Sequence, residues 1–224
     1  MNAAIIVAAG KGARMGNPDK LLLSVAGRPV VAHTWARFDG CQAVNEIILV
    51  IRQEQESLFR KLATEIKAQK PFKLVYGGKE RQDSVWNGLE ALSRNAELVA
   101  IQDGARPCTS DALIKATFAA AREHGAAVAA QPVTDTIKES TDGERITRHL
   151  DRSRLWSVQT PQTFRVDVIR RALAAVREKG MIVTDDTAAC ELIGQQVKLV
   201  ESAEPNAKLT FAKDVALIER LLKA

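Results

Sequence analysis

The alternation of apolar, strand-like runs with amphipathic segments constrains the fold of this chain more than any other feature. The apolar runs are short and continuous, which is typical of strands buried on both faces of a sheet. They occupy residues 1–9, 46–51, 73–76, 98–102, 126–130 and 197–200. The helical segments lie at residues 30–38, 54–67, 83–92, 110–124, 166–179, 185–193 and 212–222. This pattern predicts an α/β fold with a mostly parallel, twisted sheet and helices on both faces.

Residues 133–160 interrupt this alternation. Residues 137–140 and 145–147 are short, strand-like segments on either side of an Asp142-Gly143 pair, which predicts a β-hairpin. Such a hairpin has little core of its own, so an arm that packs on a partner subunit and a surface hairpin on a monomer both stay open. The chain contains no linker, repeat or low-complexity segment, so we expect a single domain, 1–224, that carries a protruding hairpin arm.

The composition and the spacing of the cysteines indicate the cellular compartment in which this protein is expected. No stretch of about 18 or more apolar residues is present, so we expect no membrane-spanning helix. The apolar N-terminal run is short and ends in a glycine-rich turn, unlike a signal peptide. Cys41, Cys108 and Cys190 lie far apart and form no metal-ligand spacing. We therefore expect reduced thiols in a cytoplasmic protein.

The net charge of +5 indicates an anionic partner. A nucleic-acid-binding protein usually carries a dense run of Lys and Arg with interleaved aromatic residues. Here the basic residues are spread along the chain, and aromatic residues make up only 4% of it. Small phosphorylated substrates therefore suit this chain better than nucleic acid.

A glycine-rich loop follows the first predicted strand. Gly10, Gly12 and Gly16 let backbone N–H groups approach a phosphate closely, because no Cβ stands in the way. The spacing is not that of a dinucleotide-binding turn, since the third glycine falls one place late and Pro18 interrupts any helix. A Walker A loop would need Gly-Lys-Ser/Thr, which is absent. A lone loop of this kind is more often a tight turn without a ligand.

Charged residues near the loop favour a phosphate site. Lys11, Arg14 and Lys20 place cations beside it, and such cations neutralise the charge that develops in phosphoryl or nucleotidyl transfer. Asp103 ends a predicted strand, at the edge of the sheet where ligands of α/β folds bind. Mg²⁺ takes one or two protein carboxylates plus phosphate oxygens, so Asp103 is the candidate metal ligand. The alternative for Asp103 is a turn residue before Gly104.

Several segments of the chain resemble known proteins. Residues 8–16 followed by Lys20 are similar to the signature of nucleotidyltransferases with a Rossmann-like fold. Further matching segments lie, in order, at residues 77–89, 103–107, 135–138, 151–162 and 184–186. Together they resemble the 2-C-methyl-D-erythritol 4-phosphate cytidylyltransferase family, whose members act in the non-mevalonate synthesis of isoprenoid precursors. The chain departs from the family pattern where Asp19 separates Lys20 from Pro18, and where Pro205 replaces an acidic residue.

The resemblance implies a transferase that moves the cytidylyl group of CTP to 2-C-methyl-D-erythritol 4-phosphate. The acceptor's phosphate would attack the α-phosphorus of CTP, and pyrophosphate would leave, giving 4-diphosphocytidyl-2-C-methyl-D-erythritol. Because the attacking group is already an anionic phosphate, no general base is required, and catalysis rests on positioning and electrostatic stabilisation. The resemblance also implies Mg²⁺ or another divalent cation as cofactor, and a homodimer formed through the arm at about 133–160.

The family pattern implies roles for individual residues of this chain. The implied catalytic residues are Arg14, Lys20, Arg152 and Lys208. The implied nucleotide-binding residues are Ala8, Ala9, Gly10, Gly12, Gly77, Arg81 and Ser84. The implied acceptor-binding residues are Asp103, Arg106, Thr136, Arg152, Thr160 and Lys208, with Asp103 also at the metal. An arm exchanged between subunits would bring Thr136 and Arg152 to the neighbour's site. We expect Asp185 only to cap the helix that follows it.

Three alternative functions compete with this interpretation. A ribitol 5-phosphate or another polyol-phosphate cytidylyltransferase would share the fold and the CTP motifs and would differ at the acceptor site. A non-catalytic nucleotide-binding module could use the same fold, since fold alone does not give function. The combination of Arg14, Lys20, Asp103 and Lys208 argues against such a module. Nucleic-acid binding, the third option, would produce a steep salt dependence.

Overall fold

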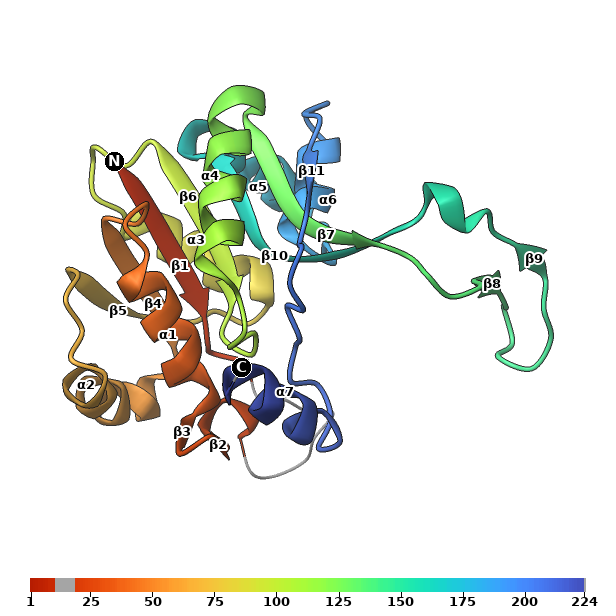
Figure 1. Cartoon of the computed structure of the whole chain (residues 1–224). Helices are drawn as coiled ribbons and strands as arrows, with labels where there is room; N and C mark the ends of the chain where they lie inside the picture. Colours follow the sequence, from red (N-terminus) through yellow and green to blue (C-terminus); the bar gives the residue numbers. More distant parts are fainter. Residues whose placement is uncertain (11–18, 224) are drawn as a thin grey trace.

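The computed structural model describes residues 1–10 and 19–223, and its centre is a seven-stranded sheet (Figure 1). The strands follow the order β11-β7-β10-β6-β1-β4-β5. Their bounds are β1 (Asn2–Val7), β4 (Glu46–Ile51), β5 (Phe72–Tyr76), β6 (Leu98–Asp103), β7 (Ala126–Pro132), β10 (Trp156–Arg165) and β11 (Lys198–Glu201). Neighbouring strands run parallel except where β10 pairs with β6 and β7. The predicted mostly parallel α/β sheet is confirmed.

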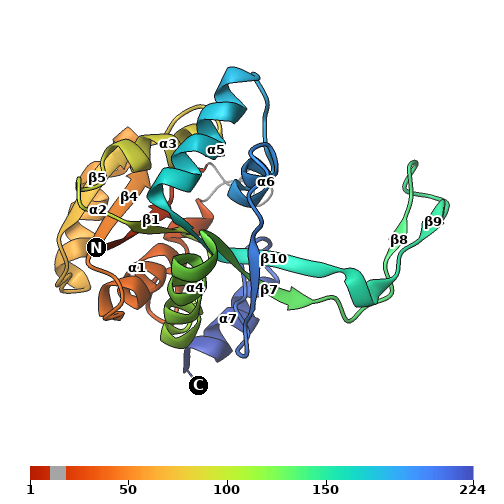
Figure 2. The ribbon, with the colours of Figure 1, turned by 90° about the horizontal axis from the view of Figure 1, so that it is seen from above.

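Helices cover both faces of this sheet (Figure 2). One face carries α1 (Val30–Gly40), α2 (Glu56–Glu65), α4 (Asp111–His124) and α7 (Asp214–Lys223). The other face carries α3 (Arg81–Glu90), α5 (Val166–Glu178) and α6 (Asp186–Glu191). Successive side chains of a strand point to opposite faces. Ile6 therefore belongs to the same core as Trp35 of α1, while Ile5 belongs to the core that contains Leu173 of α5.

Parallel pairing aligns the carboxyl ends of the central strands at one edge of the sheet. Val7, the last residue of β1, pairs with Val50 of β4 and with Asp103 of β6. The connections that follow these strands therefore leave the sheet side by side. Open α/β sheets bind their ligands at this edge. Gly10, the first glycine of the predicted loop, and Asp103 thus lie at the same edge of the sheet.

Capping side chains set where three helices begin. Ser110 precedes α4 and Asp185 precedes α6, and each accepts a hydrogen bond from a backbone N–H of the first turn, which confirms the cap predicted at Asp185. Helix α3 begins earlier than predicted, because Glu80 caps it and forms a reciprocal capping box with Asp83. The earlier start makes Arg81 the first residue of α3, at the carboxyl edge of the sheet.

Strand β10 is the main difference from the prediction, which continues the arm to about residue 160 and assigns no strand at 156–165. The inner part of β10 is polar, and its side chains Gln159, Thr160, Gln162 and Thr163 are all buried. Such a segment shows neither an apolar run nor a strict alternation, so hydrophobic periodicity does not detect it. Its pairing with β6 on one side and β7 on the other defines the strand.

Residues 133–155 form an arm that extends away from the sheet (Figure 1). Within it β8 (Lys138–Glu139) pairs antiparallel with β9 (Arg148–His149), so the predicted hairpin is present. Its second strand begins at residue 148 instead of 145, because Oδ1 of Asp142 accepts two backbone N–H groups at 2.9 Å and keeps those residues in the turn. The short 3-10 turn η4 (Arg152–Arg154) leads from the arm into β10.

Smaller elements complete the described chain. Strands β2 (Ser24–Val25) and β3 (Arg28–Pro29) form a hairpin before α1, and 3-10 turns occur at η2 (Lys20–Leu22) and η3 (Gln53–Gln55). Within residues 1–10 and 19–223, no helix combines the length and the apolar composition needed to cross a membrane. The three cysteines are free and buried.

Candidate active site

A pocket of about 620 Å³ opens at the carboxyl edge of the sheet, beyond the ends of β1 and β6. The residues predicted for the site that line this pocket are Ala9, Gly10, Lys20, Arg81, Ser84, Asp103 and Lys208. They come from the chain after β1, from the start of α3, from the end of β6 and from the segment before α7. The tertiary structure therefore gathers residues that are far apart in the sequence into one cavity. A cavity of this size suits a ligand as large as a nucleotide.

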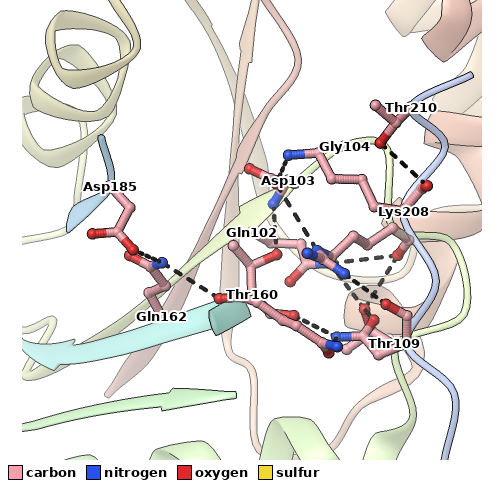
Figure 3. A network of polar contacts seen from close by, with 12 residues as sticks. Gln102, Asp103, Gly104, Thr109, Thr160, Gln162, Asp185, Lys208 and Thr210 are labelled. Carbon is pink, nitrogen blue, oxygen red and sulfur yellow. Dashed lines mark hydrogen bonds and ion pairs between the residues drawn. The ribbon is translucent and has the colours of Figure 1, made fainter. Parts of the chain in front are cut away.

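Asp103, the last residue of β6, lies close to three cations, of which Lys208 is labelled in Figure 3. Its Oδ2 accepts a hydrogen bond from Nζ of Lys208 at 2.5 Å. Arg81 lies 3.7 Å from Oδ1, and Arg106 lies 3.9 Å from Oδ2. Burial by itself would raise the pKa of Asp103, but the three cations, led by Lys208, outweigh burial and hold the pKa below its usual range. Asp103 is therefore ionised at neutral pH.

Arg81 lies between two carboxylates. Its NH1 donates to Oδ2 of Asp186 at 2.7 Å, while its NH2 lies 3.7 Å from Asp103. Asp186 is fully buried in the first turn of α6; burial raises the pKa of its carboxyl, and the guanidinium of Arg81 opposes that shift. Oδ1 of Asp186 has no hydrogen-bond partner among the described residues. Sequence reasoning missed this pairing, because an ion pair between two distant helix starts leaves no local pattern.

Gly77 and Ala8, both predicted to bind the nucleotide, do not line the pocket of the described chain, but each directly precedes a residue that does. Gly77, directly after β5, lies so close to β1 that a Cβ on it would be 2.3 Å from Cβ of Ala9 and 3.0 Å from Oγ of Ser84. Ser84 accepts a hydrogen bond from the N–H of Gly78 at 3.1 Å. Ala8 is fully buried beneath these residues. The approach of the two chain segments therefore depends on glycine at position 77.

Lys20 begins the 3-10 turn η2, and Asp19 fixes this turn. Oδ1 of Asp19 accepts a backbone N–H of the turn at 3.0 Å. Oδ2 accepts hydrogen bonds from NH2 of Arg52 at 2.6 Å and from Nε2 of Gln55 at 2.8 Å. The residue that departs from the family pattern thus anchors the turn of Lys20 to the chain after β4. Sequence reasoning missed Arg52 and Gln55, since neither belongs to a motif.

Thr160 and Arg106 lie behind Asp103 and are buried. The N–H of Asp103 donates to Oγ1 of Thr160 at 3.1 Å. NH1 of Arg106 donates to the carbonyl oxygen of Asn206 at 2.6 Å. Both residues therefore contact the protein around Asp103, and neither belongs to the pocket lining of the described chain.

The remaining predicted residues lie elsewhere. Thr136 and Arg152 are on the arm, and neither lines the pocket formed by the described residues of this chain. NH1 of Arg152 donates instead to the carbonyl oxygen of Thr134 at 2.5 Å. Gly12 and Arg14 lie outside the described residues.

The described residues include no group of three or more His, Cys, Asp or Glu side chains that could hold a metal ion. Asp103 can supply one carboxylate oxygen at the pocket, where Lys208 occupies Oδ2 and Arg81 is more distant from Oδ1. This donor set fits a cation such as Mg²⁺, which is often held by one or two protein carboxylates and otherwise by phosphate oxygens and water.

Comparisons with known proteins match nearly the whole chain to one family. A sequence profile of the 2-C-methyl-D-erythritol 4-phosphate cytidylyltransferase family matches residues 2–224. A protein of that name from Alkaliphilus oremlandii is 42% identical over 221 residues, covering 98% of this chain and 94% of the relative. One from Pelotomaculum thermopropionicum is 42% identical over 224 residues, covering 99% and 94%. The crystal structure of 4-diphosphocytidyl-2C-methyl-D-erythritol synthase from Anaerococcus prevotii has a TM-score of 0.88 at 31% identity, covering 100% of this chain and 96% of that one. The chain therefore belongs to the 2-C-methyl-D-erythritol 4-phosphate cytidylyltransferase family.

Proposed function

We infer that this chain transfers the cytidylyl group of CTP to 2-C-methyl-D-erythritol 4-phosphate and releases pyrophosphate, in the non-mevalonate synthesis of isoprenoid precursors. Membership of the family supports methylerythritol phosphate over ribitol 5-phosphate as the acceptor. The observation that carries the inference is the pocket at the sheet edge, in which Lys20, Asp103 and Lys208 converge.

The nucleotide lies, in this proposal, on the side of the pocket lined by Gly10, Gly78 and Ser84, next to Gly77. The N–H of Gly77 donates to the carbonyl oxygen of Ile51 at 2.9 Å, so in this proposal the C=O group of Gly77 approaches the edge of a cytosine ring. The triphosphate, in this proposal, lies beside Gly10 and Lys20, which both line the pocket. The family resemblance assigns Arg14 to the phosphates as well, although Arg14 lies outside the described residues. Such cations stabilise charge that develops on the phosphorus and on the leaving pyrophosphate.

The acceptor lies on the side of Asp103 and Lys208. The side chain of Lys208 is 34% exposed, so its ammonium can contact the acceptor's phosphate while Asp103 keeps it in position. An oxygen of that phosphate attacks the α-phosphorus of CTP, and the bond to the bridging oxygen of pyrophosphate breaks. No proton has to move, because the nucleophile is already an anion. The rate therefore depends on how well the two substrates are aligned and on the surrounding charges.

A divalent cation, Mg²⁺ or a similar ion, is the proposed cofactor. Asp103 would hold it together with phosphate oxygens of CTP, and Oδ1 is the oxygen that Lys208 does not occupy. When bound, such an ion neutralises charge on the triphosphate and on the leaving pyrophosphate. The lowered pKa of Asp103 supports this role, because only the ionised carboxyl is a metal ligand at neutral pH.

The arm supports a homodimer. It carries Thr136 and Arg152 outside the pocket lining of their own chain. Ile146 on the arm is 68% exposed, and Trp156 and Val158 at its base are 36% and 40% exposed. Association would bury these apolar side chains, which stabilises a dimer in proportion to the area removed from water. In such a dimer Thr136 and Arg152 serve the acceptor site of the neighbouring subunit.

A mixture of two inactive variants tests this exchange. We expect Lys20→Ala and Arg152→Ala each to abolish most turnover. Co-expressed in equal amounts, half of the dimers are mixed, and each mixed dimer contains one intact site, so activity returns to about a quarter of the wild-type value. If the arm serves its own subunit, the mixture stays inactive. Analytical ultracentrifugation measures the oligomeric state independently.

The proposal also includes a cytoplasmic location. Cys41, Cys108 and Cys190 are free and buried, which is typical of proteins in a reducing compartment. CTP, the proposed donor substrate, is a cytosolic metabolite.

The choice of acceptor is tested directly by pyrophosphate release. The protein is incubated with CTP and Mg²⁺ together with either 2-C-methyl-D-erythritol 4-phosphate or ribitol 5-phosphate. We expect turnover with the methylerythritol phosphate and little with the ribitol phosphate. Turnover with ribitol 5-phosphate alone would contradict the proposed function.

A further inference from the structure

The segment that carries Lys208 into the pocket has no regular secondary structure. Residues 202–213 form neither helix nor strand, so individual hydrogen bonds must hold Lys208 in place. Asn206 lies shortly before Lys208, and its side chain is only 3% exposed. We propose that Asn206 is a positioning residue that holds Lys208 opposite Asp103. This proposal rests on the role proposed above for Lys208 in the transfer reaction.

The side-chain amide of Asn206 is fully hydrogen-bonded. Its Oδ1 accepts from Oγ1 of Thr109 at 2.9 Å. Its Nδ2 donates to Oε1 of Gln159 at 3.0 Å and to the carbonyl oxygen of Thr160 at 2.7 Å. The backbone carbonyl of Asn206 accepts NH1 of Arg106 at 2.6 Å. Thr109 and Thr160 are seen in the network around Asp103 (Figure 3). A buried polar network rigidifies the segment that it holds, and both the oxygen and the nitrogen of the Asn206 amide take part in this one.

The partners of Asn206 are also the supports of Asp103. Oγ1 of Thr160 accepts the N–H of Asp103 at 3.1 Å, and Nε of Arg106 lies 3.9 Å from Oδ2 of Asp103. On the other side of Lys208, the N–H of Leu209 donates to a carbonyl oxygen of the turn after β6 at 2.8 Å. The chain is thus fastened on both sides of Lys208 to the residues around Asp103. This fastening brings Nζ of Lys208 to 2.5 Å from Asp103.

The position requires an amide. Aspartate has the same shape as asparagine, but its ionised carboxylate offers acceptors and no donor. The backbone carbonyl oxygen of Thr160 can only accept a hydrogen bond. In Asn206→Asp it therefore faces a carboxylate oxygen, so two acceptors lie against each other in a buried site. Relief of this repulsion moves the segment and takes Lys208 away from Asp103. Within the described chain Asn206 does not line the pocket, so its effect on the substrates passes through Lys208.

Kinetics, nucleotide affinity and stability together separate positioning from a general loss of folding. We expect Asn206→Asp to lower kcat/KM for methylerythritol phosphate about 10- to 100-fold, because displaced groups near the reacting atoms cost this much. The Kd for CTP, measured by calorimetry, stays close to the wild-type value. The matched control is Thr117→Val, since Thr117 is also fully buried and donates to the carbonyl of Ile114 at 3.0 Å, but within α4. It loses stability and keeps the wild-type kcat/KM.

A double-mutant cycle tests the route through Lys208. If Asn206 acts through Lys208, Asn206→Asp adds little to the loss of kcat/KM that Lys208→Met already causes. If Asn206 acts on the site by a route independent of Lys208, the two losses multiply. Multiplied losses, or a wild-type kcat/KM in Asn206→Asp, overturn the proposal.

The chemical reactivity of Lys208 provides a measurement that needs no substrate. Competitive acetylation followed by mass spectrometry compares Lys208 with Lys115, which pairs with Asp111 on α4. Release from Asp103 makes Lys208 react several-fold faster relative to Lys115 in Asn206→Asp, and an unchanged ratio overturns the proposal. A fully active Lys208→Met would instead refute the function proposed for Lys208, and the acetylation ratio would still report what Asn206 does.

Discussion

Replacement of Gly77 by alanine adds a methyl group where β5 ends beside the chain that follows β1. The new Cβ would lie 2.3 Å from Cβ of Ala9 and 3.0 Å from Oγ of Ser84. Non-bonded carbons prefer a separation of about 3.5–4.0 Å, so the two chain segments must part by roughly an ångström or more. The position of Cβ of Ala9 is set by the backbone, so this atom cannot rotate away. The seryl oxygen can move only by giving up its hydrogen bond with the N–H of Gly78.

The expected cost follows from this geometry. Overpacking of a closely packed site destabilises a protein by about 1–3 kcal/mol. Ala8 and the core of β1 are fully buried, so the displacement falls mainly on the turn that joins β5 to α3. Gly78 in that turn and Ser84 in the first part of α3 line the pocket. We therefore expect Gly77→Ala to weaken CTP binding about tenfold, which corresponds to about 1.4 kcal/mol, in addition to the loss of stability.

Urea unfolding and calorimetric titration with CTP measure the two effects separately. The matched control is Gly40→Ala at the end of α1, where an added Cβ meets nothing within 4 Å. This control should be neutral, or more stable by up to about 1 kcal/mol because alanine favours the helix, with wild-type affinity for CTP. A Gly77→Ala protein with wild-type stability and wild-type CTP affinity would refute the close approach of Gly77 and Ala9.

Three further predictions concern titrating and charged groups. Lys208→Met removes the leading cation of those that reverse the effect of burial on the pKa of Asp103. The lowered pKa of Asp103 stabilises the fold above about pH 3.9, and this stabilisation is lost as the pH falls through the folded-state pKa. The variant should therefore be about 1 kcal/mol less stable than the wild type at neutral pH and should approach it in acid. A difference in the free energy of unfolding by urea that does not change with pH would contradict this. Asp186→Asn leaves Arg81 free to turn toward Asp103, and we expect the Kd for CTP to rise about tenfold, whereas an unchanged Kd by calorimetry would show that Asp186 does not hold Arg81. Burial lowers the pKa of His33, so stability should fall as the pH drops below about 6.5, where only the unfolded chain takes up the proton; the slope of Tm against pH should flatten in His33→Gln, and an equal slope would count against it.

Local chemistry made most elements of the fold predictable. The run at residues 46–51 is apolar throughout, and it forms β4 with the same bounds and with every residue buried. The caps Ser110 and Asp185 are short-range features, since each acts on the turn that follows it. Strand β10 is the counterexample, because Gln159 and Gln162 are polar and buried. Partners on both sides specify such a strand, and no pattern within it does.

The residues of the site also fall into those that the sequence identified and those that only the structure revealed. Gly10, Gly77 and Asp103 belong to motifs of adjacent residues, and the structure brings them to one edge of the sheet. The sequence assigned no role to Asp186, although it lies in the matching segment 184–186, and none to Asn206, yet each contacts a residue at the pocket or its support. Their importance comes from burial and from the hydrogen bonds of distant partners, which are properties of the packed chain.

By itself the sequence determined the class of the fold, the hairpin arm, the glycine-rich loop and the set of charged candidates. Periodicity, turn residues and motifs encode these features over a few neighbouring positions. Only the tertiary structure decided that Lys208 pairs with Asp103, from which it is separated by 105 positions. It also decided that Arg81 is shared between Asp103 and Asp186. The physical reason is that such ion pairs depend on how β6, α3, α6 and the segment before α7 pack together, and that packing is a property of the whole core.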